Sequence, residues 1–405
     1  MTLPKSPLAP AEFPDFPELN GVRFASGNSG MKYQGRDDVM LAEFSAGTTA
    51  AGVFTKNSMP GAPVDWGREI LPRGTARALV VNAGIANVFT GAAGRRTVLE
   101  TAAETAAILG ADAEDIYIAS TGVIGEPVPT SKITDLLPGL QQSLSAGTGE
   151  AAAKTILTTD TFAKGAAANC KIGDKKITIA GFAKGSGMIA PDMATMLAFL
   201  FTDAAIPSDI LQTLLVDANE KSFNCVTVDA DTSTSDTVLL FATGRAGNTG
   251  ADDLADFKWA LLDVMTDLAQ QVARDGEGAS KFITVKVTGS LSDASAKTIA
   301  LAIANSPLVK TAIAGEDANW GRVIMAVGKS GEKADRDRMS LKIGGILIAE
   351  NGVKSPNYAE EDVMPHMKGD EILIEVDVAV GNGEAFAWTC DLTHGYIEIN
   401  ADYRS

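Results

Sequence analysis

The chain contains, near its midpoint, the stretch Lys184-Gly185-Ser186-Gly187-Met188-Ile189-Ala190-Pro191-Asp192-Met193-Ala194-Thr195-Met196-Leu197-Ala198-Phe199. An apolar segment at Ile177–Phe182 predicts a strand before it, and the apolar run that begins near Thr195 predicts a second strand after it. The spacing Gly185-x-Gly187-x-x-Ala190 matches a dinucleotide-binding fingerprint, but that fingerprint must open a helix whose amides face the pyrophosphate. A proline and a strand-like run take the place of that helix, so the sequence argues against nucleotide binding here.

The same glycines and proline are typical of a turn that cleaves its own backbone. Small, flexible residues can hold the Ala194–Thr195 peptide in a strained conformation in which the Thr195 hydroxyl attacks the Ala194 carbonyl. Cleavage would give Thr195 a free α-amino group, whose ordinary pKa of about 7.7 to 8.0 makes it a usable base beside its own hydroxyl. From spacing alone, a glycine-rich hairpin loop with a core-facing threonine remains the alternative.

The composition is that of a globular, acidic protein. Of the 405 residues, 45% are hydrophobic and 21% charged, which argues against disordered and fibrous classes and suits two domains or one large α/β unit. The 34 Lys and Arg against 51 Asp and Glu give a formal net charge of −17, which repels nucleic acids and anionic membranes. The longest apolar run, Met196–Phe201, is far shorter than the roughly 18 residues of a membrane span. Prolines interrupt the N-terminal segment where a signal peptide needs apolar residues, so we expect a cytoplasmic protein.

Histidine and cysteine usage narrows the chemistry. The two histidines, His366 and His394, have no GxSxG or HExxH motif beside them, which argues against a Ser-His-Asp triad and a histidine-based metal site. Cys170, Cys225 and Cys390 lie far apart without CxxC spacing, so neither a disulfide framework nor a zinc site is indicated.

The remaining patterns predict an α+β fold with antiparallel or mixed sheets. Further strands are expected at Met40–Phe44, Gly52–Phe54, Ala78–Val81, Ile116–Ala119 and around Ile283–Val287. The capping box Thr97–Glu100 predicts the start of a helix that ends at Gly110. Apolar residues at three- and four-residue spacing from Leu254 to Val272 predict an amphipathic helix that ends before Gly276.

Near the C-terminus, apolar residues alternate from Ile372 to Val380 and again from Phe386 to Leu392. The Asn382-Gly383 turn lies between them, so we predict a half-buried β-hairpin. A composition shift near residue 287 is the best candidate boundary for a C-terminal lobe.

Several ordered motifs resemble those of the ornithine acetyltransferase family, the glutamate N-acetyltransferases of arginine biosynthesis. Besides the central stretch, they are Phe54-Thr55, Ser120-Thr121-Gly122-Val123-Ile124, Thr158-Thr159-Asp160-Thr161, Thr227-Val228-Asp229, Asp231-Thr232-Ser233-Thr234, Arg274-Asp275-Gly276-Glu277-Gly278-Ala279, Ser306-Pro307-Leu308-Val309-Lys310, Thr393-His394-Gly395-Tyr396 and Asn400-Ala401-Asp402-Tyr403-Arg404-Ser405. The similarity runs over nearly the whole chain.

The resemblance implies an N-terminal-nucleophile-type sandwich of sheets and helices with a smaller C-terminal α/β lobe. It implies self-cleavage between Ala194 and Thr195 into an α chain, residues 1–194, and a β chain, residues 195–405, which assemble as α2β2. Residues 195–286 would complete the core and residues 287–405 would form the lobe. Thr195 would be the nucleophile, with Thr121 and Gly122 as the oxyanion hole. Substrate contacts would fall on Thr158, Lys184, Thr195, Glu277, Asn400 and Ser405.

The implied reaction moves an acetyl group from N-acetylornithine to glutamate through an acetyl-threonine, without a metal or organic cofactor. The motifs do not decide whether acetyl-CoA is also a donor. Two alternatives remain open: an N-terminal-threonine amidohydrolase or aminopeptidase of related fold, and a non-enzymatic acidic protein that binds a small ligand. The chain departs from the family pattern at Asp192, Ala230 and Ile85, and none of these departures removes an expected catalytic group.

Overall fold

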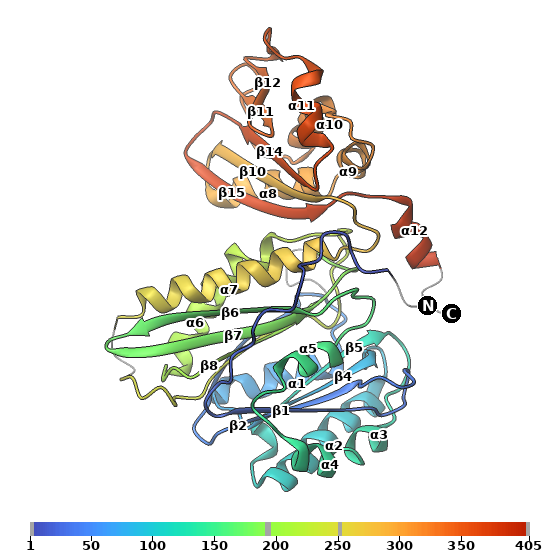
Figure 1. The fold of residues 1–405 in the computed structure, drawn as a ribbon, viewed down its shortest axis with the longest axis vertical. Helices are drawn as coiled ribbons and strands as arrows, with labels where there is room; N and C mark the ends of the chain where they lie inside the picture. The colour runs from blue at the N-terminus through green and yellow to red at the C-terminus, as the bar shows by residue number, and fades with distance from the viewer. Residues whose placement is uncertain (1–3, 191–195, 250–252, 402–405) are drawn as a thin grey trace.

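The computed structural model describes residues 4–190, 196–249 and 253–401. Its elements form three β-sheets with helices on their outer faces (Figure 1). The predicted α+β class is confirmed, and the sheets are mixed, as expected. Among the residues that the structure describes, no helix combines the length and apolar composition that crossing a bilayer requires.

The first sheet has the strand order β1-β2-β4-β5. These strands are β1 (Val22–Gly27), β2 (Val39–Phe44), β4 (Ala78–Ile85) and β5 (Ile116–Val123). Strands β4 and β5 run parallel, while β2 is antiparallel to both of its neighbours. Its helices are α1 (Ala62–Ile70), α2 (Gly91–Leu109), α3 (Thr130–Thr134), α4 (Leu137–Ser143) and α5 (Gly149–Thr155).

The second sheet has the order β3-β9-β8-β7-β6 and packs between the first sheet and two long helices. Its strands are β3 (Thr49–Phe54), β6 (Lys164–Ile172), β7 (Lys175–Lys184), β8 (Leu197–Thr202) and β9 (Thr237–Ala242). Helices α6 (Ser208–Lys221) and α7 (Ala255–Arg274) cover its outer face (Figure 1). The predicted amphipathic helix is α7, and it ends before Gly276 as expected.

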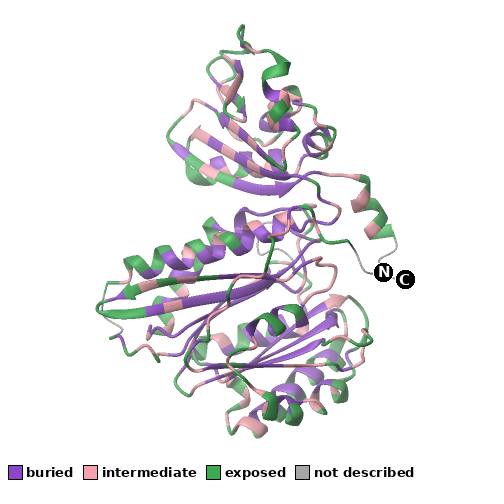
Figure 2. Cartoon of the chain, viewed as in Figure 1, coloured by how far each residue is buried: buried purple, intermediate pink, exposed green. Residues whose placement is uncertain are grey.

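Strand β8 is buried on both faces, which explains why its sequence is apolar almost throughout. Side chains alternate along a strand, so Phe199 and Phe201 enter the core toward the first sheet while Ala198 and Leu200 enter the core under α6 and α7. Phe201 meets Phe24 of the first sheet with ring centroids 5.1 Å apart. Figure 2 shows the buried residues concentrated on these strands and on the inner faces of the helices.

The third sheet has the order β13-β12-β11-β14-β10-β15. Its strands are β10 (Phe282–Ser290), β11 (Ser340–Ile343), β12 (Ile346–Glu350), β13 (Val353–Lys354), β14 (Glu371–Asp377) and β15 (Gly383–Cys390). The helices after residue 290 are α8 (Asp293–Ala304), α9 (Pro307–Ala314), α10 (Trp320–Lys329), α11 (Glu360–Met367) and α12 (His394–Ala401). The expected boundary at residues 286/287 falls within β10, and the division into domains stays a prediction.

The predicted C-terminal hairpin is wrong. Strands β14 and β15 both form, but β10 lies between them, parallel to β14 and antiparallel to β15. The segment that contains Asn382-Gly383 therefore connects β14 to β15 across the strand between them, β10, and does not join two adjacent strands. Alternation of apolar residues identifies a strand and its buried face, but it carries no information about a partner strand that lies far away in the chain.

The predicted capping box is also wrong, although the helix and its end at Gly110 are confirmed. Helix α2 begins at Gly91, so Thr97 lies in its second turn. The Thr97 hydroxyl pairs with the Thr130 hydroxyl at 2.8 Å instead of capping the helix. At the other end, Gly110 adopts a φ of 62°, the left-handed conformation with which many helices end.

Two of the three departures from the family pattern lie on described residues. Ala230 has a φ of 66°, a conformation that favours glycine, which accounts for the glycine in the pattern. Ile85 is buried at the end of β4, where its carbonyl accepts a 2.8 Å hydrogen bond from the Asn82 side chain. Asp192 lies outside the described residues.

Candidate active site

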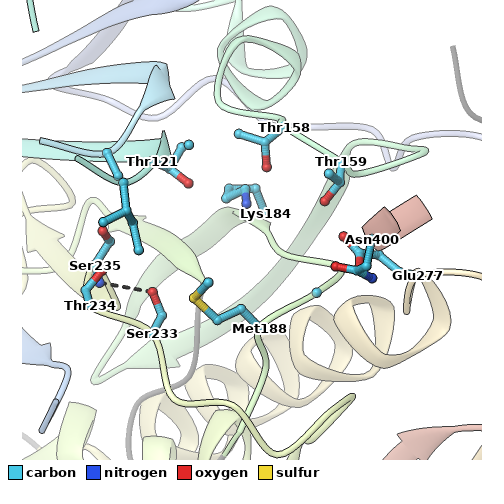
Figure 3. Close-up of a pocket in the computed structure, with 14 residues that line it drawn as sticks. Thr121, Thr158, Thr159, Lys184, Met188, Ser233, Thr234, Ser235, Glu277 and Asn400 are labelled. Carbon is cyan, nitrogen blue, oxygen red and sulfur yellow. Dashed lines mark hydrogen bonds between the residues drawn. The ribbon is translucent and has the colours of Figure 1, made fainter. Parts of the chain in front are cut away.

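A pocket of about 630 Å³, counting space open to solvent, lies beside the ends of β5 and β7 (Figure 3). Six residues singled out from the sequence line it together: Thr121, Gly122, Thr158, Lys184, Glu277 and Asn400. They come from β5, the loop after α5, the end of β7, the loop after α7, and α12. The fold thus brings residues as far apart in the sequence as Thr121 and Asn400, 279 positions from each other, to one cavity.

Ala194, Thr195 and Ser405 lie outside the described residues, but the chain immediately after Thr195 is well anchored. The Met196 amide donates to Asp236 Oδ1 at 3.0 Å, and the Met196 carbonyl accepts from the Thr237 amide at 3.1 Å. One residue later, Leu197 pairs with Lys184 across strands β7 and β8. The described chain after position 195 therefore starts next to the strand end that carries the pocket's lysine.

Gly122 closes the parallel pair of β4 and β5, where it lies opposite Gly84. It has a φ of 130°, and a Cβ on it would lie 2.2 Å from the Gly84 carbonyl carbon, so only glycine fits. The neighbouring Thr121 side chain is buried and lines the pocket. Among the described residues, none shares a hydrogen bond with the Thr121 hydroxyl, which leaves that donor for a ligand.

Lys184 is the last residue of β7 and is only 3% exposed. Its ammonium lies 3.6 Å from Asp160 Oδ2, and the other oxygen of Asp160 accepts the Gly185 amide at 2.5 Å. Burial alone would raise the pKa of Asp160, but the ammonium groups of Lys164 and Lys184 lower it below its ordinary value. The pocket's cation is thus held by a carboxylate that stays ionised.

Glu277 forms the opposite, anionic end of the pocket. It is 7% exposed, and its backbone amide donates to the Ser186 carbonyl at 3.0 Å. Its Oε2 accepts the Asn400 side-chain amide at 2.7 Å. Burial raises the pKa of Glu277, while the hydrogen bonds from Asn400 and Thr159 counteract part of that rise.

The close approach of this carboxylate explains one of the glycines in the central stretch. A Cβ on Gly187 would lie 2.4 Å from Glu277 Oε2, so a larger residue would displace the carboxylate. A dinucleotide-binding fingerprint would open a helix after β7. In the described part of the loop, residues 185–190, there is no helix, in agreement with the expectation that this stretch does not bind a nucleotide.

Eight further residues line the pocket, and none of them was predicted from the sequence as a site residue. They are Ala86, Ile124, Thr159, Gly187, Met188, Ser233, Thr234 and Ser235 (Figure 3). The Ser235 amide donates to the Ser233 hydroxyl at 3.0 Å, which shapes this wall. Thr159 and Ser233 belong to motifs that support the family resemblance, which was the signal that could have found them, whereas Ser235 lies just outside those motifs.

The lining combines a free hydroxyl beside a glycine, a buried ammonium and a buried carboxylate. A hydroxyl and a backbone amide can stabilise an oxyanion, and an ammonium with a carboxylate can bind the two charged groups of an amino acid. Within the described ranges, no three His, Cys, Asp or Glu side chains are grouped as metal ligands. The geometry therefore suits acyl chemistry on an amino-acid derivative.

The sequence also matches a family of known proteins. The ArgJ family model matches residues 23–405. Arginine biosynthesis bifunctional protein ArgJ from Gluconobacter oxydans is 56% identical over 100% of this chain and 96% of its own length. The protein of the same name from Ruegeria pomeroyi is 55% identical over 99% of this chain and 98% of its own length.

A solved structure supports the same relationship. The crystal structure of arginine biosynthesis bifunctional protein argJ from Bacillus halodurans is 43% identical with a TM-score of 0.50. It covers 51% of this chain and 99% of the solved chain. The family model matches most of the sequence, and relatives are more than half identical to it over nearly its whole length. The chain belongs to the ArgJ family.

Proposed function

We propose that the protein is an acetyltransferase of arginine biosynthesis that moves an acetyl group from N-acetyl-L-ornithine to L-glutamate through an acetyl-threonine at Thr195. The observation that carries this proposal is the convergence of Thr121, Gly122, Lys184 and Glu277 on one pocket from separate segments. The names of the ArgJ relatives support the pathway.

Self-cleavage between Ala194 and Thr195 is part of the proposal. The second sheet takes β3, β6 and β7 from residues 1–194 and β8 and β9 from residues 195–405. Backbone ladders between β7 and β8 and between β3 and β9 would hold the two chains together after cleavage. The solved Bacillus halodurans chain matches only 51% of this chain, although the match takes in 99% of the solved chain. A relative that is present as two separate chains would give such a match.

In the first half-reaction, the Thr195 hydroxyl attacks the acetyl carbonyl carbon of N-acetylornithine while the Thr195 α-amine takes the hydroxyl proton. The tetrahedral oxyanion accepts hydrogen bonds from the Thr121 hydroxyl and the Gly122 amide, donors that each contribute roughly 2.7 to 4 kcal/mol. The C–N bond then breaks, and the proton passes from the amine to the departing ornithine nitrogen. Glutamate repeats these steps in reverse and leaves as N-acetylglutamate.

The charged ends of the pocket account for the choice of amino acids. Lys184 binds a substrate carboxylate, and Glu277 binds the ammonium of ornithine. Thr158 and Asn400 line the same cavity, and Ser405 adds a further proposed contact. The scheme uses no metal or organic cofactor. The α2β2 assembly that the resemblance implies and the cytoplasmic location expected from the sequence are parts of the proposal, whereas the motifs do not decide whether acetyl-CoA is a second donor.

The test is a competition between transfer and hydrolysis. Purified protein is given N-acetylornithine with and without glutamate, and N-acetylglutamate, free acetate and ornithine are measured. We expect N-acetylglutamate to form faster than acetate, whereas acetate as the main product would favour the amidohydrolase alternative. Thr195→Ala should abolish transfer, and Thr195→Ser, which keeps a hydroxyl, should retain part of it; transfer by the alanine variant would remove Thr195 from the mechanism.

A further inference from the structure

A buried set of four charges lies behind the pocket. Lys164 is fully buried and donates to Asp160 Oδ1 at 2.7 Å and to Asp275 Oδ2 at 2.6 Å. Its third donor reaches the Phe162 carbonyl at 3.3 Å. Asp160 in turn faces the Lys184 ammonium at 3.6 Å. The set therefore alternates in sign, two cations against two carboxylates, and its side chains are 0% to 4% exposed.

Each carboxylate in this set is also bonded to the backbone that carries pocket residues. Asp160 accepts the Thr158 amide at 3.0 Å and the Gly185 amide at 2.5 Å, so it fixes the loop of Thr158 and the end of the strand of Lys184. Asp275 accepts the Thr161 hydroxyl at 2.5 Å and the Thr161 amide at 3.0 Å. It lies two residues before Glu277 and fixes the start of the loop that carries it.

We propose that Lys164 is a positioning residue of the active site, whose ammonium sets the spacing between the cationic end of the pocket at Lys184 and the anionic end at Glu277. Lys164 is absent from the pocket lining, so it acts through Asp160 on one side and through Asp275 on the other. This inference rests on the proposed function, because it names the residue that aligns the two substrate-binding charges.

Stability alone is a poor reason for such a set. Burying charges costs solvation energy, and apolar replacements of buried ion pairs are often neutral or stabilising. What a hydrogen-bonded charge network provides is fixed geometry, and here the Lys164 ammonium donates to two carboxylates and a carbonyl at distances of 2.7, 2.6 and 3.3 Å. Burial would lower the pKa of Lys164, but the two carboxylates raise it, so the ammonium stays charged.

The network also joins the two chains expected after cleavage. Lys164 and Asp160 belong to residues 1–194, and Asp275 belongs to residues 195–405. Two further contacts run between the same segments: Gln271 binds the Gly165 amide at 3.2 Å and the Gly165 carbonyl at 2.9 Å. Lys164 therefore contributes to the alignment of the pocket across the two chains, together with the Glu277 amide, which donates to the Ser186 carbonyl at 3.0 Å.

The experiment separates positioning from stability with two variants of the full-length protein. Lys164→Met removes the ammonium, which leaves Asp160 paired with Lys184 and takes away the lysine with which the buried Asp275 pairs. Lys164→Met combined with Asp275→Asn removes one charge of each sign, so the set is neutral again. We expect the single variant to lose thermal stability and the double variant to recover most of it. In both, KM for N-acetylornithine and for glutamate should rise by about tenfold or more, with a smaller change in kcat, because misplaced binding groups act on this scale.

Several results would overturn the proposal. A folded single variant with wild-type KM would do so, and so would a double variant whose KM returns to the wild-type value together with its Tm. A double variant that fails to fold would show that the network serves stability itself. The matched control is Lys154→Met, which removes an exposed lysine paired with Glu150 and should leave KM and Tm unchanged.

The failure of the proposed function is distinguishable from the failure of this inference. If the unsubstituted protein transfers no acetyl group from N-acetylornithine to glutamate, the proposed function is wrong. The same variants are then compared by calorimetric binding of L-ornithine and L-glutamate. Unchanged affinities in the double variant would overturn the positioning role of Lys164, and weakened affinities would support it.

Discussion

Asn400 donates its side-chain amide to Glu277 Oε2 at 2.7 Å, across 123 residues of sequence. The same helix, α12, carries Tyr396, whose hydroxyl donates to Asp229 Oδ2 at 3.2 Å. At its start, the Thr393 hydroxyl donates to the Gly278 carbonyl at 2.6 Å. The C-terminal helix and the residue before it are therefore tied at three points to loops around the pocket, and the helix contributes Asn400 to the pocket lining (Figure 3).

Asn400→Ala should weaken binding of the ornithine part of the donor. The change removes a hydrogen bond to a buried carboxylate, and bonds to charged groups contribute about 1.5 to 3 kcal/mol. We expect KM for N-acetylornithine to rise by about tenfold or more, with kcat nearly unchanged. Steady-state kinetics measures this, with Ile397→Ala as the control because that side chain is 63% exposed on the same helix. Equal effects of the two variants would mean that α12 acts only through its overall stability.

The pH dependence of donor use should report on Glu277. An ammonium is bound by the ionised carboxylate, and burial raises the pKa of Glu277 above the ordinary value for a glutamate. As pH falls through that raised pKa, the carboxylate takes up a proton, so kcat/KM for N-acetylornithine should fall at a pH above the ordinary glutamate range. Glu277→Gln should lower kcat/KM at neutral pH and remove this acidic limb. An unchanged acidic limb in the glutamine variant would assign it to another group.

Thr121→Val should reduce kcat by about 10²- to 10³-fold, because one oxyanion donor is lost while the shape of the side chain is kept. KM should change little, since the donor acts mainly on the transition state. The control is Thr101→Val in α2, whose hydroxyl is also buried and has no hydrogen-bond partner among the described residues. That variant should keep full activity and be as stable as the unsubstituted protein or more so. A Thr121→Val enzyme with normal kcat would exclude Thr121 from the oxyanion hole.

Ala230→Gly should stabilise the protein. Ala230 holds a φ of 66°, which costs an alanine roughly 1 to 2 kcal/mol relative to its favoured conformations, while glycine adopts it freely. The larger backbone entropy of glycine in the unfolded chain offsets part of the gain, so we expect a rise in the free energy of unfolding of about 0.5 to 1 kcal/mol. Denaturant unfolding of the two proteins measures it, and a loss of stability would contradict this reading of position 230.

Local patterns predicted much of the scaffold, and what they missed involves distant partners. The strands around Met40–Phe44, Ile116–Ala119 and Ile177–Phe182 form as expected because their apolar residues are buried in the two cores that flank the second sheet. The hairpin failed because β10 inserts between β14 and β15 from far away in the chain. A helix start was misplaced because Thr97 has a tertiary partner, Thr130.

The candidate site shows the same division. Thr121, Lys184 and Glu277 were named from family motifs, and no periodicity or spacing places them together. Ser233 and Ser235, which line the pocket, and the buried Lys164 were not predicted from the sequence. Small polar residues and a lone lysine have no distinctive sequence pattern. Only the folded chain shows that Lys164 is buried between two carboxylates.

The central claim is that Thr195 becomes an N-terminal nucleophile, and intact mass spectrometry of the natively purified protein tests it most directly. We expect two species that correspond to residues 1–194 and 195–405, with threonine as the first residue of the second. A single species of 42.0 kDa in a preparation that transfers acetyl groups would contradict it.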